Sequence, residues 1–211
     1  TPVHDREAPV HTDIAIIGSG MGGGSLAYAL RDAGAKVLII EQGDFLPVER
    51  ENWSFDAVHT RGRYKNSAAW HDATTGNDFV PGNYHYVGGS TKLYGATLPR
   101  FRECDFGAIE HIDGESPAWP ITYAELEPFY GQAEQMFWVH ANKGEDPTDP
   151  WRSTDYPFPG LSHEGAMARL AASAGEQGLR PFAAPQALDR RPGGNCVLCN
   201  TCDSFSCMVD A

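Results

Sequence analysis

The chain lacks long hydrophobic runs and is poor in basic residues. No apolar segment approaches the ~20 residues that a membrane-spanning helix needs. Among 211 residues, 28 acidic side chains outnumber 16 basic ones, which gives a formal net charge of -12. This excess disfavours sequence-independent binding to nucleic acids and attraction to anionic membranes. We therefore expect a soluble protein, cytoplasmic or periplasmic, that binds a small molecule or another protein.

Cysteine is scarce outside one short segment. The chain has five cysteines, and four of them (Cys196, Cys199, Cys202 and Cys207) lie within residues 196–207. This clustering differs from the spaced framework of a disulfide-rich secreted domain. Internal repeats and low-complexity segments are also lacking, and the length allows one large domain or two modest ones.

A strand followed by a glycine-rich turn opens the informative part of the sequence. Residues 14–17 form a continuous apolar run, which is typical of a parallel strand covered on both faces. Gly18, Gly20 and Gly23 then give the pattern GxGxxG. The first glycine permits a tight turn, the second lets the backbone approach a pyrophosphate, and the third lets helix and strand pack closely.

The elements after this turn complete a nucleotide-binding unit. Apolar residues at helical spacing predict a helix that ends near Gly34, and a second strand over residues 36–40 ends at Glu41. A carboxylate there accepts hydrogen bonds from the ribose hydroxyls of an adenosine and repels the 2'-phosphate of NADP. The sequence thus predicts an α/β, Rossmann-like fold that binds FAD or NAD.

Two later segments add to this pattern. Gly88, Gly89, Ser90 and Thr91 make a small-residue stretch that can pass close to a flat ring or a phosphate, although a plain turn gives the same residues. Residues 119–134 read WPITYAELEPFYGQAE. In order, the three motifs resemble the N-terminal part of glucose-methanol-choline (GMC) oxidoreductases, which bind FAD.

The resemblance implies a role for each matching residue. Gly18, Gly20 and Gly23 would contact the FAD pyrophosphate, Glu41 the adenosine ribose, and Gly88, Gly89, Ser90, Thr91 and Tyr94 the flavin side. Met21, Gln42 and Gly95 are further expected cofactor-binding residues. Family members often have Asn where Tyr94 stands. Some relatives attach FAD through a histidine shortly after the Gly-Gly pair, where this chain has Lys92 and Leu93, so we expect non-covalent FAD. We interpret His85 as structural.

The third motif also has a purely structural interpretation. Thr122 and Glu125 fit a capping box at the start of a helix, and an apolar face including Phe129 would pack against the protein. Pro128 is expected to kink or restart this helix. The proline-rich loop over residues 142–160 is expected to be ordered, because Trp151 and two further aromatic residues give it apolar groups to bury.

Catalytic residues are not found in this chain. GMC enzymes use a histidine, paired with a second His or an Asn, near the end of a chain more than twice as long, and none of the eight histidines here matches that pair. We therefore expect an α/β chain with an FAD-binding part at residues 1–106 and the beginning of a substrate-side α+β region at residues 107–211. The remainder of the enzyme, its C-terminal half, is expected on a second chain or is missing.

The cysteine cluster leaves several possibilities open. Cys196, Cys199, Cys202 and Cys207 have the spacing C-x2-C-x2-C-x4-C, which partly matches the ligands of an iron-sulfur cluster. Disulfides and simple packing fit as well, whereas zinc ribbons need a longer central spacing. The main hypothesis is an FAD-dependent oxidoreductase that oxidises the CH-OH group of an alcohol or sugar. The alternatives are an iron-sulfur or metal-binding electron-transfer subunit with a nucleotide fold, and an NAD-dependent dehydrogenase.

Overall fold

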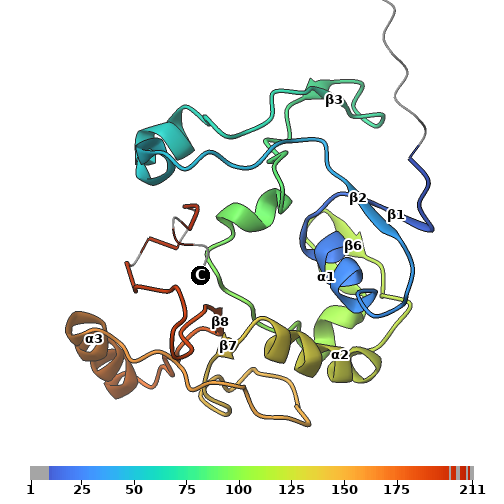
Figure 1. Cartoon of the computed structure of the whole chain (residues 1–211). Coiled ribbons are helices and arrows are strands. Elements are labelled where there is room, and N and C mark those ends of the chain that lie inside the picture. Colours follow the sequence, from blue (N-terminus) through green and yellow to red (C-terminus); the bar gives the residue numbers. More distant parts are fainter. Residues whose placement is uncertain (1–9, 200, 203–204, 208, 210–211) are drawn as a thin grey trace, which may run out of the picture. The chain divides into compact units, whose positions relative to one another are not determined.

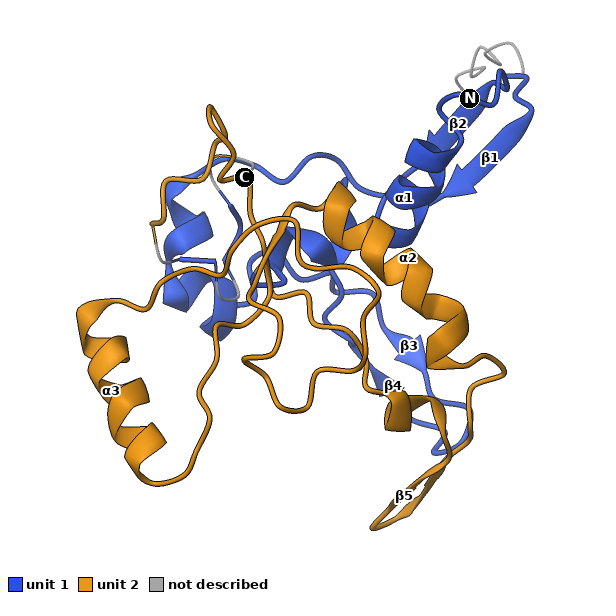
Figure 2. Cartoon of the chain, turned by 90° about the horizontal axis from the view of Figure 1, so that it is seen from below, with its two compact units in different colours: residues 1–95, 200–208 blue, residues 96–199, 209–211 orange. Residues whose placement is uncertain are grey.

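The computed structural model of the chain describes residues 10–199, 201–202, 205–207 and 209 (Figure 1). Contacts divide the chain into two compact units, residues 1–95 with 200–208 and residues 96–199 with 209–211 (Figure 2). The assignment of cofactor binding to residues 1–106 and of a substrate-side region to residues 107–211 stays a prediction. None of the helices in the described part of the chain is long and apolar enough to cross a bilayer.

The first unit begins with a parallel strand-helix-strand motif. Its elements are β1 (Ile14–Ile17), α1 (Met21–Ala29), β2 (Val37–Ile40), the short helices η1 (Arg50–Trp53), η2 (Asp56–Thr60) and η3 (Gly89–Leu93), and the hairpin of β3 (Trp70–His71) and β4 (Asp78–Phe79). Strands β1 and β2 pair in parallel, with Ile14 opposite Val37 and Ile17 opposite Ile40. The fold class predicted from the sequence is confirmed, because a strand, a helix and a second, parallel strand follow one another in the predicted order.

Two details of the predicted motif differ in the structure. Helix α1 ends at Ala29, before Gly34, and a turn carries the chain to β2. Strand β1 buries Ile16, at 6% exposure, whereas Ile17 on the opposite face is 78% exposed. The expectation that both faces are covered is therefore wrong for the described residues, because the sheet there has two strands and α1 covers one face.

The core of the first unit lies away from this sheet. Val58, Tyr64 and Leu93 are buried together, and partly buried residues around them include Phe205. The Nε1 group of Trp53 donates a hydrogen bond to the Ser206 carbonyl, at 3.3 Å. The segment that carries Cys202 and Cys207 is thus anchored on the first unit.

The second unit is built around a long helix. Its elements are η4 (Glu103–Phe106), the hairpin of β5 (Ile109–His111) and β6 (Gly114–Ser116), α2 (Tyr123–Met136), β7 (Val139–His140), α3 (Gly165–Glu176) and β8 (Gln186–Ala187), which pairs antiparallel with β7. The predicted capping box is confirmed, because Thr122 Oγ1 accepts from the Glu125 amide and Glu125 Oε2 accepts from the Thr122 amide. Helix α2 runs through Pro128 as one segment, so the predicted restart is wrong.

The buried face of α2 is largely polar. Tyr123, Glu127 and Glu134 are its buried residues, whereas Phe129, predicted on the packed face, is 62% exposed. Arg100 forms a fork with Glu134, at 2.8 Å for both nitrogen-oxygen pairs, and donates to Glu127 at 3.0 Å. The two glutamates are spaced at i and i+7, which places them on one side of the helix. An ionic network therefore replaces the expected apolar contact.

The same network fixes the proline-rich loop. Arg152 is 3% exposed and donates to Glu134 and Asp149, with nitrogen-oxygen distances of 3.1 Å to each. Trp151, predicted to be buried, is 68% exposed. The loop is ordered as expected, but a buried arginine and not the tryptophan anchors it.

Candidate functional site

The turn between β1 and α1 has the backbone geometry that the first glycine permits. Gly18 has φ of +88°, in the left-handed region, and its amide donates to the Ile40 carbonyl at 2.7 Å. A side chain at this position would strain the backbone. The hydrogen bond continues the β1–β2 pairing into the turn, so the turn is held at the carboxyl end of both strands.

Gly23 is needed for close packing between the helix and this turn. A Cβ atom built at Gly23 would lie 1.9 Å from the Gly18 carbonyl oxygen and 3.2 Å from Cγ2 of Ile16. By contrast, a Cβ at the neighbouring Gly22 meets no atom within 4 Å. The third glycine of the motif thus allows α1 to approach β1, as predicted for this position.

The structure brings the two glycine motifs together within the first unit. The Gly88 amide donates to Ser19 Oγ at 2.9 Å. A Cβ atom at Gly20 would lie 3.9 Å from the Gly88 carbonyl oxygen, and one at Gly89 would lie 3.6 Å from the Cα of Gly20. Gly88 and Gly89 have φ of +93° and +58°. Segments 69 residues apart in sequence therefore meet at the turn, backbone against backbone.

Glu41 joins the same cluster from the end of β2. Ser19 donates to Glu41 Oε2 from its hydroxyl at 2.6 Å and from its amide at 2.8 Å, and the Gln42 amide donates to Oε1 at 2.8 Å. These hydrogen bonds, led by that of the Ser19 hydroxyl, lower the pKa of Glu41 to about 2. The carboxylate is therefore ionised at neutral pH and lies beside the glycine turn.

Comparisons with known proteins agree with this geometry. A family model described as an NAD(P)-binding Rossmann-like domain matches residues 16–74. The chain is 31% identical over 210 residues to 6'''-hydroxyparomomycin C oxidase of Streptomyces lividus, an alignment covering 94% of this chain and 36% of the relative. The chain belongs to the GMC oxidoreductase family.

Two further GMC relatives are named as dehydrogenases. The chain is 28% identical to 2-methyl-1,2-propanediol dehydrogenase of Mycolicibacterium austroafricanum, over 86% of this chain and 34% of that protein. It is 29% identical to oxygen-dependent choline dehydrogenase of Rhizobium johnstonii, over 71% and 26% respectively. The chain thus spans about a third of the length of the GMC relatives that it matches.

The residues at the turn fit a dinucleotide of the kind that GMC enzymes bind. Helix α1 begins at Met21, and its N-cap, Gly20, contributes no side-chain cap. No acidic residue occupies the first turn of this helix, so its first amides face no negative side chain of their own. The glycines leave the backbone uncovered there, as a pyrophosphate requires. The Glu41 carboxylate lies beside this turn through its hydrogen bonds with Ser19, and its contact with a ribose stays a prediction.

The second GMC motif forms a short helix. Gly88 is the N-cap of η3, and Thr91 Oγ1 donates to the Gly88 carbonyl. Ser90 and Thr91 lie within η3, and Gly95 follows it with φ of +83°. The segment is thus a turn and a helix, as the plain interpretation of these residues predicted. Their contacts with a flavin stay a prediction.

Tyr94, where GMC relatives often have asparagine, lies next to two of the cysteines. Burial raises the pKa of its hydroxyl, and negative charge on Cys202 and Cys207 adds to this effect. Cys196 and Cys199 belong to the second unit, where the Cys196 amide donates to the Asp189 carbonyl at 3.0 Å. The four cysteines are thus divided between the two units.

No group of three or more His, Cys, Asp or Glu side chains is placed to hold a metal ion within the described residues. Each of the five cysteines is described as a thiol. Iron-sulfur ligation by Cys196, Cys199, Cys202 and Cys207 stays a prediction.

Sequence reasoning missed Ser19 and Gly43. Ser19 connects Glu41 to Gly88, yet it occupies a variable position of the glycine pattern, where no residue type is demanded. A Cβ at Gly43 would lie 1.6 Å from the His85 carbonyl oxygen, so this glycine allows the chain before the second motif to pass beside the end of β2. The ring of His85 contacts the side-chain amide of Asn66. We predict no contact between this histidine and a flavin. The only sequence signal for Gly43 was its place two residues after Glu41.

Proposed function

We propose that this chain is the FAD-binding part of a GMC-type oxidoreductase that oxidises the CH-OH group of an alcohol or sugar. The proposal rests on two hydrogen bonds at one turn: the Gly88 amide donates to the Ser19 hydroxyl, and this hydroxyl donates to Glu41. They join three separate parts of the GMC pattern. Relatives named 6'''-hydroxyparomomycin C oxidase, 2-methyl-1,2-propanediol dehydrogenase and paromamine 6'-oxidase support the reaction class.

Each part of the turn has a proposed role. The backbone of Gly18, Gly20, Met21 and Gly23 binds the pyrophosphate, because a Cβ at Gly23 would close the space between turn and helix. Glu41, with Gln42 beside it, accepts hydrogen bonds from the ribose hydroxyls. Its low pKa keeps it an acceptor at neutral pH. Because Ser19 already donates twice to Oε2, the ribose would bind at Oε1 or displace the Ser19 hydroxyl.

The segment over residues 88–95 would line the flavin. Gly88 and Gly89 lie against Gly20, so a cofactor bound at the turn passes the second motif. Tyr94 would then offer its hydroxyl where relatives offer an amide. The proposal assigns non-covalent attachment, because Lys92 and Leu93 stand where some relatives have the linking histidine. Bound FAD would supply the acceptor for the hydride of the substrate carbon.

The remaining catalytic groups are proposed to come from a further part of the enzyme. Alcohol oxidation needs a base for the hydroxyl proton, and a histidine with a suitable pKa serves this purpose. Relatives are about three times longer than this chain. The exposed face of β1, with Ile17 at 78% exposure, is where further elements of this enzyme would pack.

An NAD-dependent dehydrogenase is the second candidate, supported by the description of the family model that matches residues 16–74. The third is an iron-sulfur electron-transfer subunit, supported by the cysteine spacing alone. These three candidate functions are distinguished by adding a panel of alcohols and sugars, without oxygen, to the purified full-length protein. Bleaching of a flavin spectrum by one substrate supports the main proposal. A colourless protein that reduces added NAD with the same substrate contradicts it, and iron in stoichiometric amount supports the cluster.

A further inference from the structure

An aromatic pocket in the second unit is not used by the proposed cofactor site. The pocket has a volume of about 530 Å³, and its walls include Phe106, Trp119, Tyr123, Trp151 and Glu103. Phe106 and Tyr123 are buried, whereas Trp119 and Trp151 are 52% and 68% exposed. All of these residues belong to residues 96–199, so the pocket lies within one unit.

The rings of the pocket are held in a fixed arrangement. The Trp119 ring lies 6.0 Å from the Phe106 ring, which in turn lies 6.1 Å from the Tyr123 ring. The Trp119 amide donates to the Phe106 carbonyl at 3.0 Å, and the Tyr123 hydroxyl donates to the Trp151 carbonyl at 2.6 Å. The pocket is thus preformed, with two indole rings partly open to solvent. Exposed aromatic surface of this kind marks a binding site more often than a plain surface does.

The charged side chain that lines the pocket is that of Glu103; Arg100, which donates to the Tyr123 hydroxyl, is buried and paired with glutamates of α2. Residues 103–125 contain six carboxylates and no lysine or arginine. Glu103, on the pocket wall, has no ion-pair partner in the described part of the chain. Aromatic faces attract cations, and a carboxylate beside them adds charge complementarity. The chemistry of the walls therefore suits a guanidinium or ammonium group.

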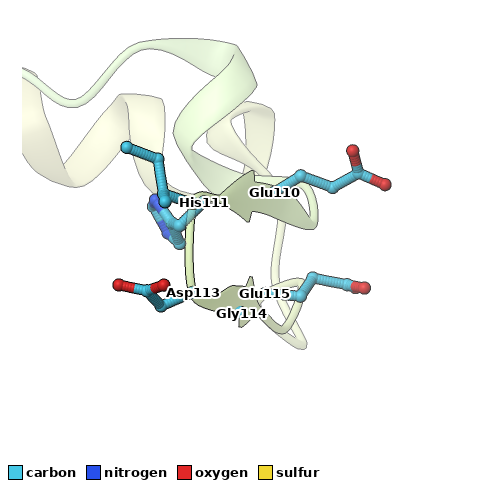
Figure 3. A pocket seen from close by; sticks show the side chains of 6 residues that line it. Glu110, His111, Asp113, Gly114 and Glu115 are labelled. Carbon is cyan, nitrogen blue, oxygen red and sulfur yellow. The ribbon is translucent and has the colours of Figure 1, made fainter.

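The hairpin of β5 and β6 extends this negative surface. Phe106 and Trp119 flank the hairpin in sequence and pair with each other, so its base is continuous with the pocket. Glu110 and Glu115 are directly opposite each other in the register, and both side chains project to the same side (Figure 3). Like charges in such a pair destabilise a hairpin. A cationic partner would remove this repulsion.

We propose that the aromatic pocket and the adjacent acidic hairpin bind a basic segment of a partner protein, with one arginine side chain in the pocket. Arginine is favoured because its planar guanidinium stacks on indole rings and pairs with a carboxylate in a fork. The hairpin lies outside the pocket and extends the acidic surface, which favours a peptide segment over a small cation. The isoleucine at the hairpin tip, Ile112, is fully exposed and offers an apolar contact to the same partner. This surface is independent of the FAD proposal.

The test measures binding of a fluorescent peptide with alternating glycine and arginine to the full-length protein, by fluorescence anisotropy. A peptide with citrulline in place of arginine is the control, because citrulline keeps the shape and loses the charge. The arginine peptide is expected to bind, with affinity that falls as salt is added. Equal binding of both peptides would contradict the proposal. So would the lack of binding to the full-length protein, since another part of the enzyme would then cover the pocket.

Variants locate the binding site. We expect Trp119→Leu and Glu103→Gln each to lower the affinity for the arginine peptide about tenfold, which corresponds to about 1.4 kcal/mol in the free energy of binding. Trp119→Phe keeps a ring in the wall and should retain most of the affinity, which separates loss of the site from loss of the fold. Trp70→Leu removes an equally exposed tryptophan, at 51% exposure in the other unit, and should change nothing. Unchanged affinity in Trp119→Leu and Glu103→Gln would overturn the proposal.

Discussion

The spacing of the glycine turn gives the sharpest prediction, because two adjacent glycines of α1 have different surroundings. An alanine at position 23 would place its Cβ 1.9 Å from the Gly18 carbonyl oxygen, about 1.5 Å closer than an ordinary contact. The turn and the helix would have to separate, since the clashing atom belongs to the backbone. Overpacking of this kind costs about 1–3 kcal/mol in the free energy of unfolding. The displacement also moves the amides proposed to bind the pyrophosphate.

Gly22→Ala is the matched control, since a Cβ there meets nothing within 4 Å. Alanine is the better helix former, so this variant should raise the free energy of unfolding by about 0.5–1 kcal/mol. Urea denaturation measures both free energies, and the flavin content of the purified protein measures cofactor binding. We expect Gly23→Ala to be purified with little flavin and Gly22→Ala with the normal amount. Equal stability and equal flavin content in the two variants would refute the reasoning.

Three further predictions follow from other contacts. Arg100→Ala should lower the free energy of unfolding by about 3–5 kcal/mol, since it removes the arginine partner of the buried Glu127 and leaves the buried Glu134 with Arg152 alone; Arg63→Ala, which breaks an exposed pair with Glu49, should cost much less in the same denaturation assay. Glu41→Gln should weaken FAD binding about tenfold or more in calorimetric titration, because hydrogen bonds to a charged acceptor are lost, whereas Asp32→Asn, at an exposed acid, should not. Ser19→Ala should raise the pKa of Glu41 above about 2, because the Ser19 hydroxyl is the main cause of its lowering; NMR titration of the carboxyl carbon checks this, and an unchanged pKa would contradict it.

The sign of the pH dependence at Glu41 follows from the direction of its shift. The pKa is lowered on folding from 4.5 to about 2, so the carboxylate stabilises the fold above pH 4.5. This stabilisation is lost as the pH falls toward 2. In Ser19→Ala the loss should still begin near pH 4.5, but it should be smaller and complete at a higher pH, because only the pKa of the folded state rises.

The local geometry of the nucleotide motif was predictable from sequence, because the first and third glycines stand where the backbone leaves no room for a side chain or has a conformation that disfavours one. Gly18 with its positive φ and Gly23 with its close contact are such cases. The end of α1 was not predicted correctly, since apolar spacing continued beyond Ala29 into a turn. The exposure of Ile17 was missed because a continuous apolar run does not reveal how many elements cover the strand.

The polar interior of the second unit was not predictable from residue patterns. Arg100 and Arg152 are buried by pairing with glutamates on α2, and this pairing depends on segments that are far apart in sequence. Arginines are ordinarily exposed, so an apolar face for α2 was the natural expectation. The link from Gly88 through Ser19 to Glu41 depends in the same way on a contact across 69 residues. Long-range polar partners are the part of a site that sequence spacing does not specify.

The most direct test of the account is to identify the dinucleotide in the full-length protein. The protein is purified without added cofactor, its visible spectrum is recorded, and the small molecules released by denaturation are identified by mass spectrometry. The account predicts a flavin spectrum and about one FAD per chain released into solution, since attachment is non-covalent. Release of NAD, or a colourless protein that takes up no FAD with Glu41 and the glycines intact, would contradict the account.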